Sequence, residues 1–145
     1  MLLKLIKKII RNYNKFIFRN RLYYYRKLGI KIGKNFSLSP EAYLDLHCPK
    51  MIEIGDNVKV SRWAMILCYD SAKGMTPFKN LYNTPYGKTK IGNNVYIGAH
   101  SIIMPGVTIE DNVIIGANSL VLNDIPSNCI IGGTPAKKLK DLPPF

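Results

Sequence analysis

The chain has 145 residues, which is enough for one domain, and a formal net charge of +12. The excess charge lies in residues 1–34, which contain eleven Lys or Arg and no acidic residue. No apolar run reaches the roughly 20 residues of a membrane span, and closely spaced lysines interrupt any signal-peptide core. Three cysteines, Cys48, Cys68 and Cys129, are too few for a disulfide framework. The sequence therefore predicts a cytoplasmic protein with buried thiols.

Residues 2–28 are predicted to form a helix. Apolar residues recur every three or four positions, at Leu3, Ile6, Ile10, Tyr13 and Ile17. Two roles are open for this basic arm: it covers one end of the domain that follows, or it makes a peripheral contact with an anionic membrane. Residues 23–25 are three tyrosines that could stack on bases, but no recognition module surrounds them, so no nucleic-acid partner is predicted.

A six-residue repeat organises the rest of the chain and is most regular over residues 91–126. Isoleucine or valine opens each of six consecutive blocks, at Ile91, Ile97, Ile103, Ile109, Ile115 and Val121. The fourth position of each block holds a residue type that tolerates positive φ, namely Asn94, His100, Gly106, Asn112, Asn118 and Asp124. Less regular blocks begin near Ile32 and Ile54.

A period of six is neither helical nor the simple alternation of a long strand. It fits short strands that each point two side chains inward and end in a tight turn. Three blocks would form one triangular coil, and stacked coils would form an all-β solenoid with parallel strands. Stacking is required because each buried Ile or Val contributes roughly 1.5–3 kcal/mol only when a neighbouring coil covers it.

Two segments depart from the repeat. Residues 72–90 form an insertion of 19 residues rich in aromatic and basic side chains. A loop of this length inside a regular repeat usually has a function. After Pro126, residues 127–140 match the ending of the family to which these repeats are compared below, a last partial coil followed by a basic tail, and Pro143 and Pro144 then prevent extended regular structure.

These repeats resemble those of the hexapeptide-repeat acyltransferases, and most closely the maltose and galactoside acetyltransferases and the small acetyltransferases of surface-polysaccharide biosynthesis. The resemblance implies a left-handed parallel β-helix with an N-terminal helical cap and a projecting loop. The expected divisions are an arm (1–28), a β-helix domain (29–140) that carries the loop 72–90, and a tail (141–145). The resemblance also implies a homotrimer whose active sites lie between neighbouring chains.

The resemblance implies transfer of an acetyl group from acetyl-CoA to a hydroxyl or amino group of a sugar or glycan. The family's catalytic histidine usually stands in a context like Ile-Leu-x-His-Asp, but residues 66–70 here read Ile-Leu-Cys-Tyr-Asp. Tyr69 replaces the histidine, and a tyrosine with a pKa near ~10 is a poor base at neutral pH. Three explanations are open: Tyr69 is a tuned base or orients the acceptor while Asp70 takes the proton, the acceptor is a neutral amine, or catalysis is weak.

Only two histidines could replace the missing base. His47 lies roughly one coil before Tyr69, so it is a candidate catalytic residue, although a solvent-facing loop position explains it equally. His100 occupies a turn position and needs no functional explanation. Trp63 is predicted to stack on a sugar ring or to pack against the N-terminal helix or a partner.

The resemblance also implies where acetyl-CoA binds. Coenzyme A in this family runs between neighbouring solenoids and contacts backbone at the third hexapeptide position, which corresponds here to Ala99 and Ala117. Two basic residues near the C-terminus, Lys137 and Lys140, match those that meet the nucleotide phosphates. Asn123 stands at a position that often makes a polar contact.

A second class of function is a non-catalytic trimeric scaffold that the basic arm holds at the inner face of a membrane. The zinc carbonic anhydrases share the expected fold, but they need three histidine ligands for each metal ion. This chain has two histidines and no cluster of cysteines, so no metal site is predicted.

Overall fold

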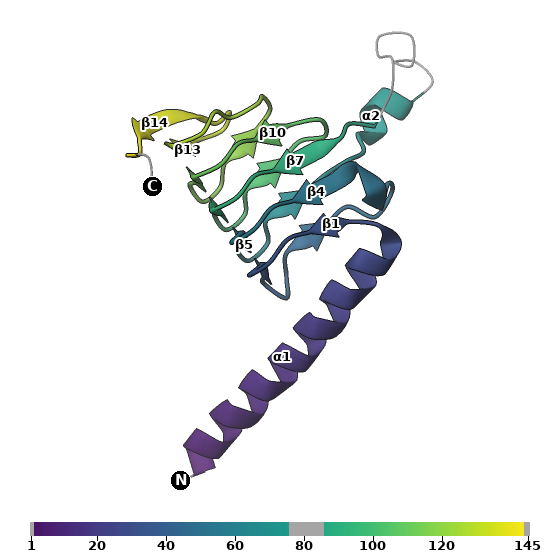
Figure 1. Cartoon of the computed structure of the whole chain (residues 1–145), viewed down its shortest axis with the longest axis vertical. Coiled ribbons are helices and arrows are strands. Elements are labelled where there is room, and N and C mark those ends of the chain that lie inside the picture. Colours follow the sequence, from purple (N-terminus) through teal and green to yellow (C-terminus); the bar gives the residue numbers. More distant parts are fainter. Residues whose placement is uncertain (1, 76–85, 144–145) are drawn as a thin grey trace.

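The computed structural model describes residues 2–75 and 86–143, and it shows a three-sided stack of short strands with one long helix at its end (Figure 1). The helices are α1 (Leu2–Leu28), the 3₁₀ turn η1 (Pro49–Met51) and α2 (Ser71–Gly74). In spatial order, sheet A holds β1 (Lys31–Ile32), β4 (Ile52–Ile54), β7 (Thr89–Ile91) and β10 (Thr108–Ile109); sheet B holds β14 (Lys137–Asp141), β13 (Cys129–Gly132), β11 (Val113–Ile115), β8 (Val95–Ile97), β5 (Lys59–Val60) and β2 (Ser37–Leu38); and sheet C holds β12 (Leu120–Val121), β9 (Ile102–Ile103), β6 (Met65–Ile66) and β3 (Tyr43–Leu44).

From β1 to β12 the chain visits sheets A, B and C in turn, so each of these circuits adds one strand to every sheet. Strands of successive circuits pair in parallel; in sheet B, for example, β5, β8 and β11 pair with one another in sequence. Asn94 and Asn112 occupy the same corner 18 residues apart, which is the length of three hexapeptides. The predicted solenoid of parallel strands is therefore confirmed.

The core is a column of isoleucine, valine and leucine side chains that point inward from all three sheets. The opening residue of each hexapeptide lies in it, including Ile91, Ile97 and Ile103. Cys68 and Cys129 also lie in this core with free thiols, and Cys48 is half-buried. Because one coil has only about six inward residues, such as Ile91, Val95, Ile97, Ser101, Ile103 and Val107, the circuits above and below supply most of the apolar contact.

The corner between sheets A and B is built from asparagines in the left-handed conformation: Asn35, Asn57, Asn94, Asn112 and Asn128 have φ between 52° and 60°. Their side chains form a ladder in which each amide donates to the next oxygen at 2.9–3.0 Å. The residue types at the fourth hexapeptide position predicted a positive φ, and five of the six regular blocks have one. The exception is Asp124, whose carboxylate instead accepts a hydrogen bond from the Thr108 N–H at 2.7 Å.

The C-terminal half of α1 covers the first circuit. Tyr25 is buried in the core, and Phe18 and Leu22 pack against it. The Arg21 guanidinium donates to the carbonyl oxygens of Pro40 at 2.6 Å and Ala42 at 2.9 Å, and Arg26 donates to two further carbonyls of this circuit. These bonds satisfy carbonyl groups that no earlier circuit could reach.

At the opposite end of the stack, residues 137–141 form β14, which turns back and pairs antiparallel with β13. The basic residues predicted to follow the last partial coil thus lie on a strand. The insertion is shorter than predicted, because Thr89 and Lys90 already belong to β7. Residues 76–85 of that insertion lie outside the described residues.

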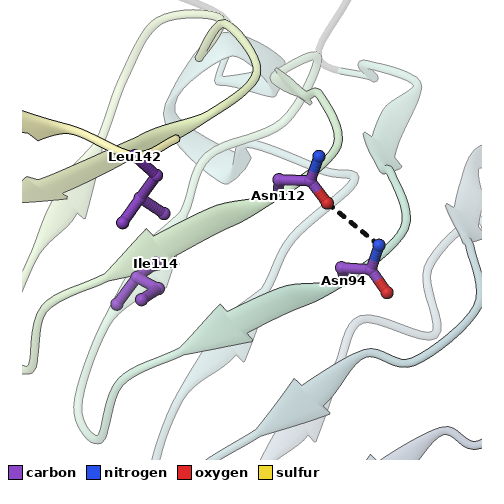
Figure 2. A pocket seen from close by; sticks show the side chains of 4 residues that line it. All are labelled: Asn94, Asn112, Ile114 and Leu142. Carbon is purple, nitrogen blue, oxygen red and sulfur yellow. Dashed lines mark hydrogen bonds between the residues drawn. The ribbon is translucent and has the colours of Figure 1, made fainter. Parts of the chain in front are cut away.

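Sheet B carries a shallow apolar recess near β14, lined by Asn94, Asn112, Ile114 and Leu142. Figure 2 shows Leu142 next to Ile114 of β11, while the amide of Asn94 donates to Asn112. These four side chains carry no acid, base or nucleophile. The recess therefore has no group that could act in catalysis.

Candidate active site

A hollow of about 270 Å³ lies where the chain leaves sheet C for sheet A, at the base of the insertion. It gathers one histidine, two carboxylates and two tyrosines. Its lining is Tyr43, Asp45, His47, Leu67, Tyr69, Asp70, Ser71 and Met104. All three predicted catalytic residues, His47, Tyr69 and Asp70, therefore line one hollow. We refer to it below as the corner hollow.

Asp45 and His47 form a hydrogen-bonded pair within the corner hollow. Strand β3 buries Leu44, and the turn that follows places Oδ1 of Asp45 2.7 Å from Nδ1 of His47. The same oxygen accepts the His47 backbone N–H at 3.0 Å. The Asp45 side chain is 3% exposed, whereas that of His47 is 60% exposed. One ring nitrogen is thus anchored to a buried carboxylate, and the imidazole itself remains open to solvent.

The second oxygen of Asp45 ties this turn to the next circuit. Oδ2 accepts backbone N–H bonds from Cys68 at 3.1 Å and from Tyr69 at 3.0 Å. Burial by itself would raise the pKa of Asp45, but the hydrogen bonds from the backbone and ring of His47 and from the backbone of Cys68 outweigh it and lower the pKa below its usual value. Asp45 is therefore held as a carboxylate.

Aromatic rings support His47 from one side. The Tyr69 ring is stacked on the imidazole with its centroid 4.7 Å away and an interplanar angle of 19°. Tyr86 belongs to the C-terminal end of the insertion. Its ring centroid lies 5.1 Å from that of Tyr69, and an antiparallel bridge joins the two residues. The rings limit the rotation of the imidazole and keep its edge at the hollow.

Asp70 and Cys68 are engaged in structural contacts. The Asp70 carboxylate accepts the Ala72 N–H at 3.0 Å and caps α2. The Cys68 thiol is fully buried, and burial raises its pKa to about 11. At neutral pH it is a neutral thiol, which is not a nucleophile.

The residues predicted to bind acetyl-CoA lie on other parts of the stack. Ala99 and Ala117 lie at the corner between sheets B and C, which the whole width of sheet C separates from the corner hollow. Lys137 and Lys140 are exposed on β14, and Asn123 is exposed after β12. One chain therefore does not bring the predicted donor-binding and catalytic residues together.

His100 and Trp63 also lie at the corner between sheets B and C. Both are in the left-handed conformation, with φ of 58° and 60°, so the turn role predicted for His100 is confirmed. Trp63 is 55% exposed and stacks on His100 with a centroid separation of 6.2 Å. The ring contact that the structure gives Trp63 is thus with His100, and not with one of the partners predicted for it, a sugar ring, the N-terminal helix or another chain.

Asp45 was missed by the sequence reasoning. The signal available was an acidic residue that directly follows an inward-pointing leucine and stands two positions before a histidine. That spacing places both side chains on one turn, but the contact to residues 68 and 69 is visible only in the folded stack.

Within the described residues there is no group of three His, Cys, Asp or Glu that could hold a metal ion, and no helix is long and apolar enough to cross a membrane.

Comparisons with known proteins agree with this architecture. A family model described as "Bacterial transferase hexapeptide (six repeats)" matches residues 88–123. Protein CapG from Staphylococcus aureus is 42% identical over 120 residues, which are 81% of this chain and 69% of that protein. The crystal structure of a maltose O-acetyltransferase from Clostridium difficile 630 is 28% identical with a TM-score of 0.62, over 95% of this chain and 84% of that one. A galactoside acetyltransferase in complex with coenzyme A is 27% identical with a TM-score of 0.56, over 78% and 65% of the two chains.

Proposed function

This chain belongs to the bacterial hexapeptide-repeat transferase family and is an acetyltransferase, and we propose that it transfers the acetyl group of acetyl-CoA to a hydroxyl group of a sugar or surface-polysaccharide precursor. Similarity to a maltose O-acetyltransferase supports the sugar hydroxyl as acceptor. Similarity to a galactoside acetyltransferase bound to coenzyme A supports the donor. The left-handed winding of that family is part of the same proposal. So is a cytoplasmic location, which the free thiols support.

The observation that carries the proposed chemistry is the pairing of His47 with buried Asp45. A hydroxyl group is a weak nucleophile, so a base must take its proton as it attacks. Because Nδ1 of His47 is bound to Asp45, Nε2 is the nitrogen available to the acceptor. The Asp45 carboxylate also stabilises the imidazolium that forms. His47 thus replaces the histidine that Tyr69 displaced, from one circuit earlier.

The proposed acetyl transfer has two steps, attack on the thioester and breakdown of a tetrahedral intermediate. The acceptor oxygen bonds to the thioester carbonyl carbon while Nε2 of His47 takes the hydroxyl proton. The tetrahedral intermediate then breaks its carbon–sulfur bond, and the protonated imidazole returns the proton to the departing sulfur. The products are an acetyl ester of the sugar and free coenzyme A, with His47 neutral again.

We assign supporting roles to the two other predicted catalytic residues. Tyr69 positions the imidazole by stacking on it, and its hydroxyl can contact the acceptor. Asp70 orders the start of the insertion through its cap on α2. This assignment favours a working hydroxyl acetyltransferase over the amine-acceptor and weak-site explanations, because the His47–Asp45 pair supports a histidine as the proposed base.

We further propose that the active unit is a homotrimer. Ala99 and Ala117 would contact the donor by their backbone, with Asn123, Lys137 and Lys140 near its polar and phosphate groups. Ala99 and Ala117 lie at a different corner of the chain from His47, and Lys137 and Lys140 lie on sheet B, so a neighbouring copy must present one set to the other. Parallel packing of copies would place the corner between sheets B and C of one chain beside the corner hollow of the next.

The proposal is tested by following release of the coenzyme A thiol from acetyl-CoA across a panel of hydroxyl and amino sugars. We expect thiol release above the acceptor-free rate with at least one hydroxyl sugar, and acetate found on oxygen in the product. Absence of thiol release with every acceptor, together with no acetyl-CoA binding by calorimetry at millimolar donor, would contradict it.

The second candidate is a trimeric scaffold without useful catalysis, held at a membrane by residues 1–28. The replacement of the usual histidine by Tyr69 is the observation that favours it. The same thiol-release assay separates the candidates, because a scaffold would give equal rates for the wild-type protein and a His47→Ala variant.

A further inference from the structure

Helix α1 consists of two parts with different surroundings. From Phe18 to Leu28 it is bound to the first circuit through Phe18, Leu22 and Tyr25 and through the Arg21 and Arg26 hydrogen bonds. The N-terminal part of α1 extends beyond the stack of sheets, with its N-terminus far from them (Figure 1). Phe18 is the first described residue of the helix that packs against the core, so residues 2–17 are taken as the projecting part. At 1.5 Å per residue, residues 2–17 project by roughly 24 Å.

Among the side chains of the projecting part that the structure describes, four large apolar ones are exposed. Ile6, Ile9, Ile10 and Phe16 are 41%, 59%, 53% and 54% exposed. At 3.6 residues per turn they fall within about 120° of the helix circumference, so they form one continuous stripe. We call these four residues the apolar stripe. A solvated face of a helix would not carry such a row.

The charge of the arm restricts what can cover the apolar stripe. Residues 2–20 contain six Lys or Arg and no acidic residue. The same helix of a second copy would bring like charges together and is disfavoured. A nucleic acid would match the charge, but its phosphates and sugars would not bury isoleucine side chains. An anionic lipid surface supplies negative head groups and an apolar layer together.

We propose that residues 2–17 of α1 lie in the surface of an anionic membrane, with the apolar stripe inserted among the acyl chains, while residues 18–28 hold the β-helix at that surface. Both roles predicted for the arm are then fulfilled by different halves of one helix. The hydrogen bonds of Arg21 and Arg26 fix the C-terminal half of α1 to the domain, and the helix is continuous through both halves. Membrane binding by the N-terminal half would therefore orient the whole stack. The inference does not depend on acetyl transfer, because none of its residues lines the corner hollow.

The test uses the full-length protein in flotation with two kinds of vesicle, phosphatidylcholine alone and a mixture with about 30% phosphatidylglycerol. We expect at least tenfold more protein on the anionic vesicles, and a fall of at least fivefold when salt rises from about 0.1 M to about 0.5 M. A double variant, Ile9→Glu with Ile10→Glu, should lose at least tenfold of the binding. Both positions are more than half exposed, so its melting temperature and β-rich circular dichroism should match the wild type.

The matched control is Leu139→Glu, which makes the same kind of change at a 66% exposed position on β14. It should bind anionic vesicles as the wild type does. Equal binding to both kinds of vesicle, or equal binding by the wild type and the double variant, would overturn the proposal. So would a double variant that changes only the oligomeric state or only the binding of a single-stranded oligonucleotide, because either result would assign the apolar stripe to another partner.

Discussion

Nδ1 of His47 lies 2.7 Å from Oδ1 of Asp45, and the aspartate is buried while the imidazole is open to solvent. The pair is locked by the adjacent circuit, because the other carboxylate oxygen accepts two backbone N–H groups from residues 68 and 69. The proposed base and its orienting group are thus held by the stacking of two coils.

The first prediction concerns activity of Asp45→Asn. The substitution keeps the size of the side chain but removes the charge that fixes the imidazole and stabilises its protonated form. We expect kcat to fall by about tenfold or more, with a smaller change in KM for acetyl-CoA. Steady-state kinetics by thiol release measures both. Wild-type kcat in a folded Asp45→Asn protein would show that the carboxylate has no part in orienting His47.

The second prediction concerns the pH dependence of stability. The pKa of Asp45 is lowered on folding, because hydrogen bonds from His47 and Cys68 outweigh the effect of burial, so its contribution is fully present above the unfolded pKa of about 4 and is lost as pH falls through the folded value. Asp45→Asn should therefore be less stable than the wild type by about 1–3 kcal/mol at pH 7. Denaturant unfolding should show this difference shrinking below pH 4. A difference that is constant from pH 3 to 7 would mean that the charge is not responsible.

The third prediction distinguishes stacking from proton transfer at Tyr69. Tyr69→Phe keeps the ring against His47 but removes the hydroxyl group, so kcat should stay within about fivefold of wild type. Tyr69→Ala removes the stack and should lower kcat by about tenfold or more. If Tyr69→Phe loses as much activity as Tyr69→Ala, the hydroxyl is required and the tuned-tyrosine explanation is favoured.

The fourth prediction concerns donor binding. Lys137→Glu places a negative charge where a phosphate of acetyl-CoA is proposed to lie, so KM for the donor should rise about tenfold with little change in kcat. Lys59→Glu makes the same charge reversal on the outer face of β5 and serves as the control. Equal effects of the two substitutions would show that only net charge matters.

The regular part of the fold was predictable because its signal is local. In the blocks from Ile91 to Val121 the inward residues recur every six positions. The turn residues Asn94 and Asn112 are of a type that favours the left-handed conformation, and both adopt it. Trp63 has the same conformation without any such sign, because its φ is imposed by the corner and not by its residue type.

The site was predictable only in part. His47 could be named as a candidate base, but its reach was unknown because the length of the first irregular coil sets where it meets Tyr69. Asp45 was not predicted, because the backbone N–H groups that bind its second oxygen lie 23 and 24 residues further along the chain. Strand β14 was not predicted, because its pairing with β13 is a tertiary contact that no local pattern records.

The most direct test of the account is the thiol-release rate of His47→Ala at saturating acetyl-CoA and acceptor. Loss of the base should lower kcat by about 10²-fold or more, while His100→Ala, the matched change at the only other histidine, should leave kcat close to wild type. A His47→Ala protein that is folded and turns over at the wild-type rate would contradict the central claim.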